Sequence, residues 1–197
     1  MIRQSDENPG RNPKTPSPRA LLLSIERALA SNSTDPSARA QDLFYEAMEA
    51  PTATAKLALL EKALKLDSGN VDVLLTLFRH ETLSPADKIE FLQKLVKLAE
   101  TRLGPEAFQE FAGAFWGFHK TRPYMRVRAM LAEQLRAAGR VEEAIAEWQA
   151  MLVLNPGDNQ GLRYALLSSL LALHRLEEAR KLFENYPGEF AFNAAFA

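Results

Sequence analysis

The chain has no cysteine and only three histidines among its 197 residues. Without cysteine it can form no disulfide, no thiolate nucleophile and no cysteine metal site. The histidines, His80, His119 and His174, lie too far apart in sequence to form the pair, three or four residues apart, that binds metal on one helix. We therefore expect neither a metal site nor a cofactor.

Catalytic motifs are also missing. The sequence contains no G-x-x-x-x-G-K-[ST] or G-x-G-x-x-G phosphate-binding loop and no G-x-S-x-G serine elbow. It does contain two pairs of adjacent glutamates, Glu142–Glu143 and Glu177–Glu178. Adjacent side chains on a helix point about 100° apart, and carboxylates in the first turn of a helix stabilise its dipole. We therefore predict no catalytic residues and no enzymatic activity.

Neither charge nor hydropathy points to nucleic acid or membrane. The 24 lysines and arginines nearly balance the 25 aspartates and glutamates, for a net charge of -1. A protein with so little net charge exerts no long-range attraction on polyanions. No stretch approaches the roughly 18 to 20 apolar residues that span a bilayer, and the N-terminus lacks the apolar run of a signal peptide. We expect a cytoplasmic protein with no membrane partner.

Proline is concentrated at the N-terminus. Residues 1–18 hold four of the eleven prolines among polar side chains, with almost nothing apolar to bury. Such a composition is typical of a disordered tail. We predict a disordered segment over 1–18 and a single folded domain over 19–197.

Period-2 alternation is absent from the rest of the chain, which indicates an all-α fold. After Pro18, Leu22, Ile25 and Leu29 fall on one helical face. From residue 37 onward, apolar-periodic segments alternate with short turns that carry Gly, Pro, Asn or Asp. The predicted helices are 38–49, 53–66, 70–81, 85–102, 105–119, 123–138, 141–154, 159–173 and 175–185.

Several helix starts carry residues that favour capping. Ser84, Thr121 and Asp158 each precede a predicted helix, where their side-chain oxygens can accept hydrogen bonds from its first N–H groups. Within the predicted helix 105–119, Gly113 and Gly117 form a G-x-x-x-G pattern among aromatic residues. That pattern favours close helix packing around an aromatic core, with an exposed aromatic surface as the alternative.

The C-terminal third of the chain repeats itself. Seven residues recur at a common offset of 35: Leu131, Leu135, Arg140, Glu142, Glu143, Ala144 and Trp148 align with Leu166, Leu170, Arg175, Glu177, Glu178, Ala179 and Phe183. The small alanines let two helices approach closely, the leucines fill the groove between them, and the aromatic residue packs against the next unit. The offset therefore predicts an array of helical hairpins.

These residues resemble the tetratricopeptide repeat (TPR) superfamily, whose period is about 34 residues. Residues 125–158 are similar to one copy, 160–187 to a second and 38–70 to a third, whereas 71–122 departs from the pattern. The resemblance implies a right-handed superhelical stack of antiparallel helix pairs with a concave groove. The groove positions that clamp chaperone C-termini in this family hold Ala129, Glu133, Tyr164 and Ser168 here, which implies that the chain has no such clamp.

A second resemblance covers residues 115–164. The segments FWGFHKTRPYMRVR and LNPGDNQGLRY are similar to segments of bacterial repeat proteins related to the suppressor-of-tumorigenicity-seven family. This resemblance implies a bacterial helical-repeat protein, and it implies no activity.

Arginine and tyrosine gather at the starts of two predicted helices. The candidate partner-binding residues are Arg122, Tyr124, Arg126 and Arg128 in one set and Asn159, Gln160, Arg163 and Tyr164 in the other. In TPR-like stacks the first helix of each hairpin lines the groove, so an offset of 35 would place the two sets side by side. Guanidinium groups beside tyrosines suit carboxylates or a peptide backbone. The alternative is structural: Asn159 and Gln160 complete a turn, and Arg128 and Arg163 pair with glutamates such as Glu133 or Glu147.

The favoured function is a non-enzymatic protein–protein interaction module that binds a peptide or helix of a partner protein. Two alternatives remain: a substrate-presenting or regulatory part of a larger enzyme, and a nucleic-acid-associated protein. The second is less favoured because glutamates alternate with the arginines. The C-terminal residues 189–197, with Phe190, Phe192 and Phe196, are expected to pack onto the last two helices, to join a second copy in a homo-oligomer, or to begin a longer array.

Overall fold

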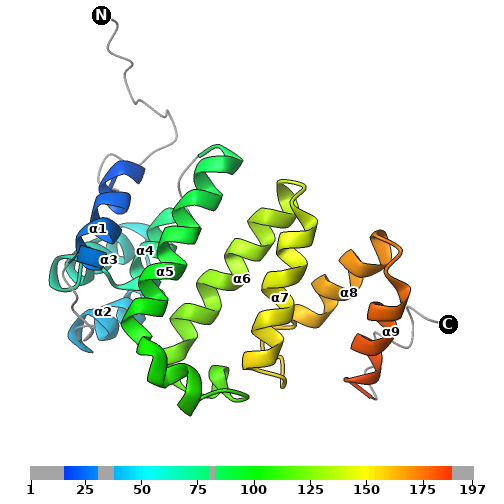
Figure 1. The fold of residues 1–197 in the computed structure, drawn as a ribbon. Helices are drawn as coiled ribbons and strands as arrows, with labels where there is room; N and C mark the ends of the chain where they lie inside the picture. Colours follow the sequence, from blue (N-terminus) through cyan, green and yellow to red (C-terminus); the bar gives the residue numbers. More distant parts are fainter. Residues whose placement is uncertain (1–15, 31–37, 80–82, 188–197) are drawn as a thin grey trace, which may run out of the picture.

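The computed structural model describes residues 16–30, 38–79 and 83–187, and all regular structure in these ranges is helical. Figure 1 shows the helices, with no strand in the described part of the chain. The α-helices are α1 (Pro18–Ala30), α2 (Ala38–Glu49), α3 (Ala53–Leu66), α4 (Val71–Phe78), α5 (Pro85–Glu110), α6 (Arg122–Ala137), α7 (Val141–Leu154), α8 (Leu162–Ala172) and α9 (Leu176–Glu184). The predicted all-α class is confirmed.

Successive helices pack against one another as hairpins. Helix α2 contacts α3, α4 contacts α5, α6 contacts α7, and α8 contacts α9. Each hairpin also contacts the next through α3 and α4, α5 and α6, and α7 and α8, while α1 packs on α4 and α5. In Figure 1, α5 to α9 follow one another across the molecule, and α1 to α4 gather at one end.

Three of the predicted helices have the observed bounds, and two of the predicted caps form hydrogen bonds to the helices that follow them. The predicted helices 38–49, 53–66 and 141–154 have the observed bounds of α2, α3 and α7. The Ser84 hydroxyl accepts a hydrogen bond from the backbone N–H of Asp87 at 3.2 Å, as predicted. Asp158 likewise accepts from the backbone of Leu162 at 2.7 Å.

The predicted helix 105–119 is wrong beyond residue 110. Helix α5 continues through a break at Gly104, whose φ of 73° and ψ of 159° are not helical, and it ends at Glu110. Two short 3₁₀-helices follow, η1 (Phe115–Gly117) and η2 (His119–Thr121). The chain leaves the helix because Phe115 is fully buried, with its ring centroid 5.2 Å from that of Phe108.

Two further expectations for this segment are wrong. Gly113 and Gly117 are exposed, and a methyl group at either position would meet no atom within 4 Å, so they mediate no close helix packing. The Thr121 hydroxyl does not cap α6, because it donates hydrogen bonds to the carbonyls of Phe115 and Phe118 instead. Thr121 therefore stabilises the two 3₁₀-helices that lead into α6.

The offset of 35 reappears in the backbone of two turns. The N–H of Arg140 donates to the carbonyl of Leu135 at 2.9 Å, and that of Arg175 donates to Leu170 at 2.9 Å. The preceding residue is left-handed in both turns, with φ 78° at Gly139 and φ 55° at His174. The α6–α7 and α8–α9 hairpins therefore turn in the same way.

The core runs through all the hairpins. Its largest fully buried side chains include Trp148, Phe91 and Phe115. Both repeat alanines, Ala144 and Ala179, are 0% exposed, as close helix contact requires.

A buried ion pair joins three parts of the N-terminal region. The Arg102 guanidinium of α5 donates to both carboxylate oxygens of Asp67, at 2.7 and 2.8 Å, in the turn between α3 and α4. Gly69 lies in the same turn, where a side-chain methyl group would come within 2.5 Å of Arg102 Nη2 and 2.6 Å of Ala28 Cβ on α1. Only glycine fits without a shift of these neighbours.

Some predictions fall outside the described residues. They are residues 1–15 of the predicted disordered segment 1–18, the role of His80, and the packing of the C-terminal segment 189–197. The last residue of the predicted segment, Pro18, begins α1.

Candidate functional site

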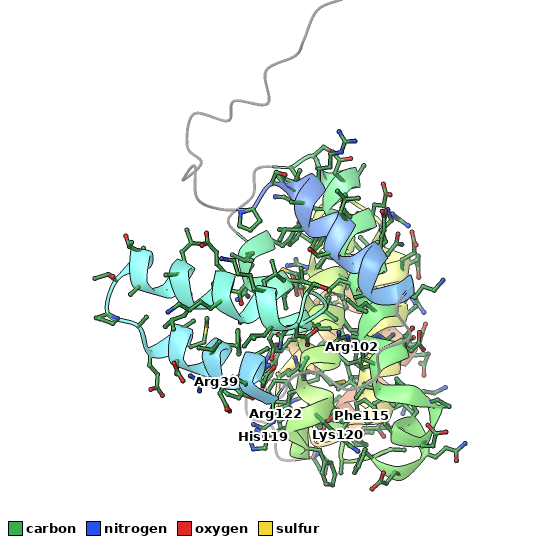
Figure 2. All side chains as sticks on the ribbon, turned by 90° about the vertical axis from the view of Figure 1, so that its left-hand side faces the viewer. Arg39, Arg102, Phe115, His119, Lys120 and Arg122 are labelled. Atoms are coloured by element: carbon green, nitrogen blue, oxygen red, sulfur yellow. The ribbon has the colours of Figure 1, made fainter. Side chains whose placement is uncertain are left out.

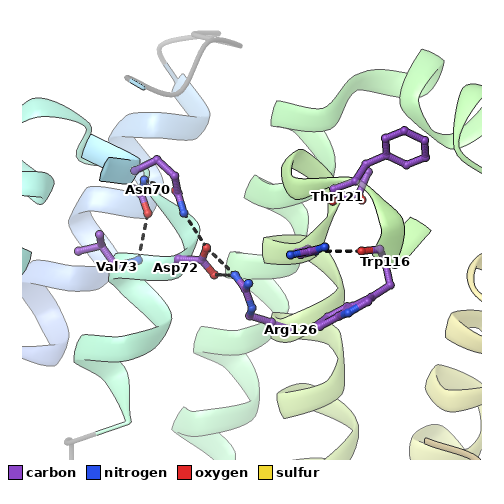
Figure 3. A network of polar contacts seen from close by, with 9 residues as sticks. Asn70, Asp72, Val73, Trp116, Thr121 and Arg126 are labelled. Carbon is purple, nitrogen blue, oxygen red and sulfur yellow. Dashed lines mark hydrogen bonds and ion pairs between the residues drawn. The ribbon is translucent and has the colours of Figure 1, made fainter. Parts of the chain in front are cut away.

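The candidate site lies where η1 and η2 lead into α6. The backbone N–H of Trp116 donates to Asn155 Oδ1 at 3.4 Å, and its carbonyl accepts from Arg122 Nε at 2.9 Å. Trp116 is partly buried against the core. These two hydrogen bonds hold the backbone of Trp116, and Figure 3 shows its side chain beside Arg126 of α6.

A polar network connects α2, α4 and α6 beside Trp116. The side chain of Asp72 is 1% exposed. Arg126 Nη1 donates hydrogen bonds to both of its carboxylate oxygens, each at 2.7 Å. Asp72 also accepts from Gln41 Nε2 at 3.1 Å. Asn70 donates to Gln41 Oε1 at 3.0 Å and accepts from the N–H of Val73 at 3.0 Å. In Figure 3, Asp72 faces Arg126, and Trp116 lies on the other side of that arginine.

Two arginines lie against the Trp116 ring. The Cζ atoms of Arg122 and Arg126 are each 5.8 Å from the ring centroid. Because the two residues stand four apart on α6, they share one face of the helix. Among the described residues, the Arg122 side chain has one hydrogen-bond acceptor, the Trp116 carbonyl, which binds Nε. Its two terminal nitrogens keep their capacity to donate.

The surface around these arginines is basic. His119 and Lys120 are exposed just before α6, and Figure 2 shows both with Arg122 at the lower edge of that end of the molecule. Lys120 Nζ lies 4.3 Å from the Phe111 ring centroid and 4.0 Å from a carboxylate oxygen of Glu110. The first turn of α6 holds no acidic residue. Of this pair of arginines, Arg126 contacts a carboxylate, that of Asp72.

Tyr124 and Arg128, in the same predicted set, have mainly structural contacts. Arg128 Nε donates to Glu147 Oε2 of α7 at 2.7 Å, and Nη1 donates to the Tyr124 hydroxyl at 3.1 Å. Tyr124 is buried, and this burial raises the pKa of its phenol above 10.0 despite the nearby Arg128. The alternative that Arg128 pairs with Glu147 is confirmed.

The second predicted set surrounds the turn before α8. Arg163 pairs with Asp158 at 2.9 Å rather than with Glu133 or Glu147, and it donates to the Tyr164 hydroxyl at 3.1 Å. Asn159 Oδ1 accepts from Asn155 at 3.2 Å. Its interaction closes the turn, as the structural alternative predicted. The Tyr164 ring is 40% exposed.

A hydrogen bond links Gln160 of the second set to α6, the helix that carries the first set. Gln160 Nε2 donates to the backbone carbonyl of Met125 at 3.4 Å, across an offset of 35. Two residues complete the site around Arg122, namely Trp116 and Asp72. Sequence reasoning missed both of them. Trp116 was assigned to a helix that ends before it, and no sequence signal links Asp72 to Arg126.

The described residues contain no group of three or more metal-ligating side chains, and none of their helices combines the length and apolar character needed to cross a membrane. No protein-family model, curated protein or solved structure matches the chain.

Proposed function

We propose that this protein is a non-enzymatic, TPR-type interaction module of the cytoplasm. In this proposal the hairpins form a right-handed stack, and the first helix of each hairpin (α2, α4, α6 and α8) lines the face that receives a peptide or helix of a partner protein. The recurrence of hairpin turns at an offset of 35 supports the repeat assignment.

Polar contacts between successive first helices support the choice of face. Gln41 of α2 contacts Asp72 of α4, which contacts Arg126 of α6. Gln160, just before α8, contacts the Met125 carbonyl of α6. These contacts keep the first helices at defined spacings, so a ligand would meet a preorganised surface and lose less entropy on binding.

The observation that carries the proposal is the surface at Trp116. It presents a partly buried aromatic ring, two arginines against it, and unused guanidinium donors on Arg122. Tryptophan and arginine are enriched among the residues that contribute most to protein–protein binding. The Arg122 side chain is partly exposed, so its two terminal nitrogens can donate to a ligand that arrives from solvent.

Nucleic acid is the less favoured partner because most of the arginines considered for it are neutralised. Among Arg122, Arg126, Arg128, Arg136, Arg140 and Arg163, five pair with carboxylates: Arg126 with Asp72, Arg128 with Glu147, Arg136 with Glu133, Arg140 with Glu143, and Arg163 with Asp158. Phosphate binding along a strand needs several available cations.

The proposal is tested by photo-crosslinking in cells of the source organism. A photoreactive amino acid replaces exposed residues near the first helices, His119 and Tyr164, and exposed control residues on second helices, Lys62 of α3 and Ala146 of α7. We expect the same protein to crosslink from His119 and Tyr164 and not from the controls, as identified by mass spectrometry. Crosslinking from the second helices alone, or from no position, would contradict the proposed face.

A further inference from the structure

We infer that the partner segment that docks beside Trp116 is acidic and places a side-chain carboxylate between Arg122 and Arg126. This inference rests on the proposed function and adds the chemistry of the ligand. Arg122 and Trp116 lie outside the positions that correspond to the chaperone-tail clamp of TPR proteins, so the site is assigned from its own geometry.

Arg122 is oriented before any ligand arrives. Its Nε donates to the Trp116 carbonyl at 2.9 Å, and its guanidinium carbon lies 5.8 Å from the ring centroid of the same residue. The side chain is partly buried, which limits its rotamers. An anchored guanidinium with both terminal nitrogens available can donate to both oxygens of a carboxylate.

Arg126 is only partly satisfied by Asp72. A single nitrogen, Nη1, serves both oxygens of that carboxylate, and the arginine side chain remains 30% exposed. Asp72 therefore compensates one positive charge, and the charge of Arg122 remains without an adjacent carboxylate. Near η2, Lys120 Nζ lies 4.0 Å from a carboxylate oxygen of Glu110, and both side chains of this pair are exposed. The local field thus favours an anion.

The local charge fits one or two carboxylates rather than a nucleic-acid strand. A strand would require a track of available cations, whereas Arg128 and Arg136 on the same helix are already paired with glutamates. Trp116 offers an apolar face for the methylene groups or backbone of a peptide next to its carboxylate. The class of ligand is therefore a peptide segment with Asp or Glu.

The inference is tested by selecting peptides from a random displayed library on the immobilised full-length chain. The same selection is repeated with Arg122→Gln and with the control Arg180→Gln, whose guanidinium lies on exposed α9. We expect Asp and Glu to be enriched for the wild type and for Arg180→Gln, but not for Arg122→Gln. Arg122 makes no ion pair with any residue of 16–30, 38–79 or 83–187, so its replacement should leave the fold intact, as checked by thermal melting.

A selected peptide is then synthesised and its dissociation constant measured by calorimetry. We expect Arg122→Gln to raise the constant tenfold or more, Arg122→Lys to raise it less, and Arg180→Gln to change it less than twofold. Replacing the acidic residue of the peptide by its amide should raise the dissociation constant of the wild type by the same factor. The same replacement should leave the dissociation constant of Arg122→Gln unchanged.

The outcomes separate the inference from the proposed function. Selected peptides without acidic enrichment, bound equally by wild type and Arg122→Gln, would overturn the inference and leave a peptide-binding module. Failure to enrich any peptide would count against both. A short single-stranded oligonucleotide is the third probe. Both the inference and the proposed function would be overturned in favour of nucleic acid if it bound more tightly than every selected peptide and if the logarithm of its affinity fell by several units per unit of log salt concentration.

Discussion

Two turns of the molecule share a pattern of backbone hydrogen bonds, although φ is -63° at Asn70 and 45° at the equivalent Asp158, and they are stabilised in different ways. In the turn between α3 and α4, the N–H of Asp67 donates to Ala63 and that of Asn70 donates to Asp67. In the turn between α7 and α8, the N–H of Asn155 donates to Met151 and that of Asp158 donates to Asn155. Asn70 and Asp158 then cap the following helices.

The difference lies in how each turn satisfies its buried carboxylate. Asp158 binds Arg163, five residues away, and the backbone N–H groups of Leu162 and Arg163. Asp67 binds Arg102, 35 residues away on α5, and both side chains are less than 10% exposed. The later turn is thus stabilised mainly by local contacts, whereas the earlier one depends on the packing of a distant helix.

The largest expected effect follows from removing the distant partner. Arg102→Ala leaves the Asp67 carboxylate buried without its cation, and we expect a loss of about 3 to 5 kcal/mol in the free energy of unfolding. Arg163→Ala should cost less, because two backbone N–H groups still bind Asp158. Urea denaturation of both variants measures the difference. Equal losses would show that the two turns do not differ in the way described.

A matched pair of glycines tests the same comparison through packing. Gly69→Ala places a methyl group within 2.6 Å of Ala28 Cβ, so we expect a loss of about 1 to 3 kcal/mol. Gly157 holds the equivalent place in the later turn, where the nearest atom would be Asn159 Oδ1 at 3.8 Å. Gly157→Ala should therefore stay within about 0.5 kcal/mol of wild type. Thermal melting of both variants measures the two losses of stability. A larger loss for Gly157→Ala than for Gly69→Ala would contradict the prediction.

Within the repeat itself, a smaller effect is expected at the hairpin turns. His174 adopts φ 55°, a region that favours glycine, whereas the equivalent Gly139 has φ 78°. His174→Gly should stabilise the protein by about 0.5 to 1 kcal/mol, and Gly139→Ala should destabilise it by a similar amount. Both changes are read from melting temperatures. If His174→Gly lowers the melting temperature, the side chain of His174 has a stabilising contact that outweighs the strain.

The smallest effect concerns the exposed ion pairs of the same turns. A hydrogen bond from Arg140 lowers the pKa of Glu143, and one from Arg175 lowers the pKa of Glu178, both below 4.5. For each glutamate the pKa is lower in the folded state than in the unfolded state. The contribution of the ion pair to the free energy of unfolding is therefore present above the unfolded-state pKa and is lost as pH falls through the folded-state pKa. Glu143→Gln and Glu178→Gln should therefore differ slightly from wild type at neutral pH and converge with it in acid.

Urea denaturation at several pH values measures that convergence. Since the side chains of Glu143 and Glu178 are largely exposed, solvent screens the pairs, and the difference at neutral pH should approach the limit of detection. A difference that persists well below pH 4.5 would mean that the glutamates act through something other than their charge.

How far the sequence predicted the site depends on the residue. The pairing of Arg128 with Glu147 was one of the two pairings that the structural alternative named. Asp158 binds the first N–H groups of the following helix as predicted, but that helix begins at Leu162 rather than at 159, with Gly161 at its N-cap. Trp116 was misplaced because a run of aromatic residues with two glycines reads as a helix, whereas burial of Phe115 and the Thr121 hydrogen bonds direct the chain into 3₁₀ turns.

The sequence alone determined the all-α class, most helix bounds and the recurrence at an offset of 35, because helical periodicity and turn residues act over a few neighbours. Only the tertiary structure decided that Asp72 meets Arg126, 54 residues apart, and that the guanidinium carbons of Arg122 and Arg126 both lie 5.8 Å from the Trp116 ring centroid. Such contacts depend on how whole helices pack, and no local pattern encodes a partner that lies on another hairpin.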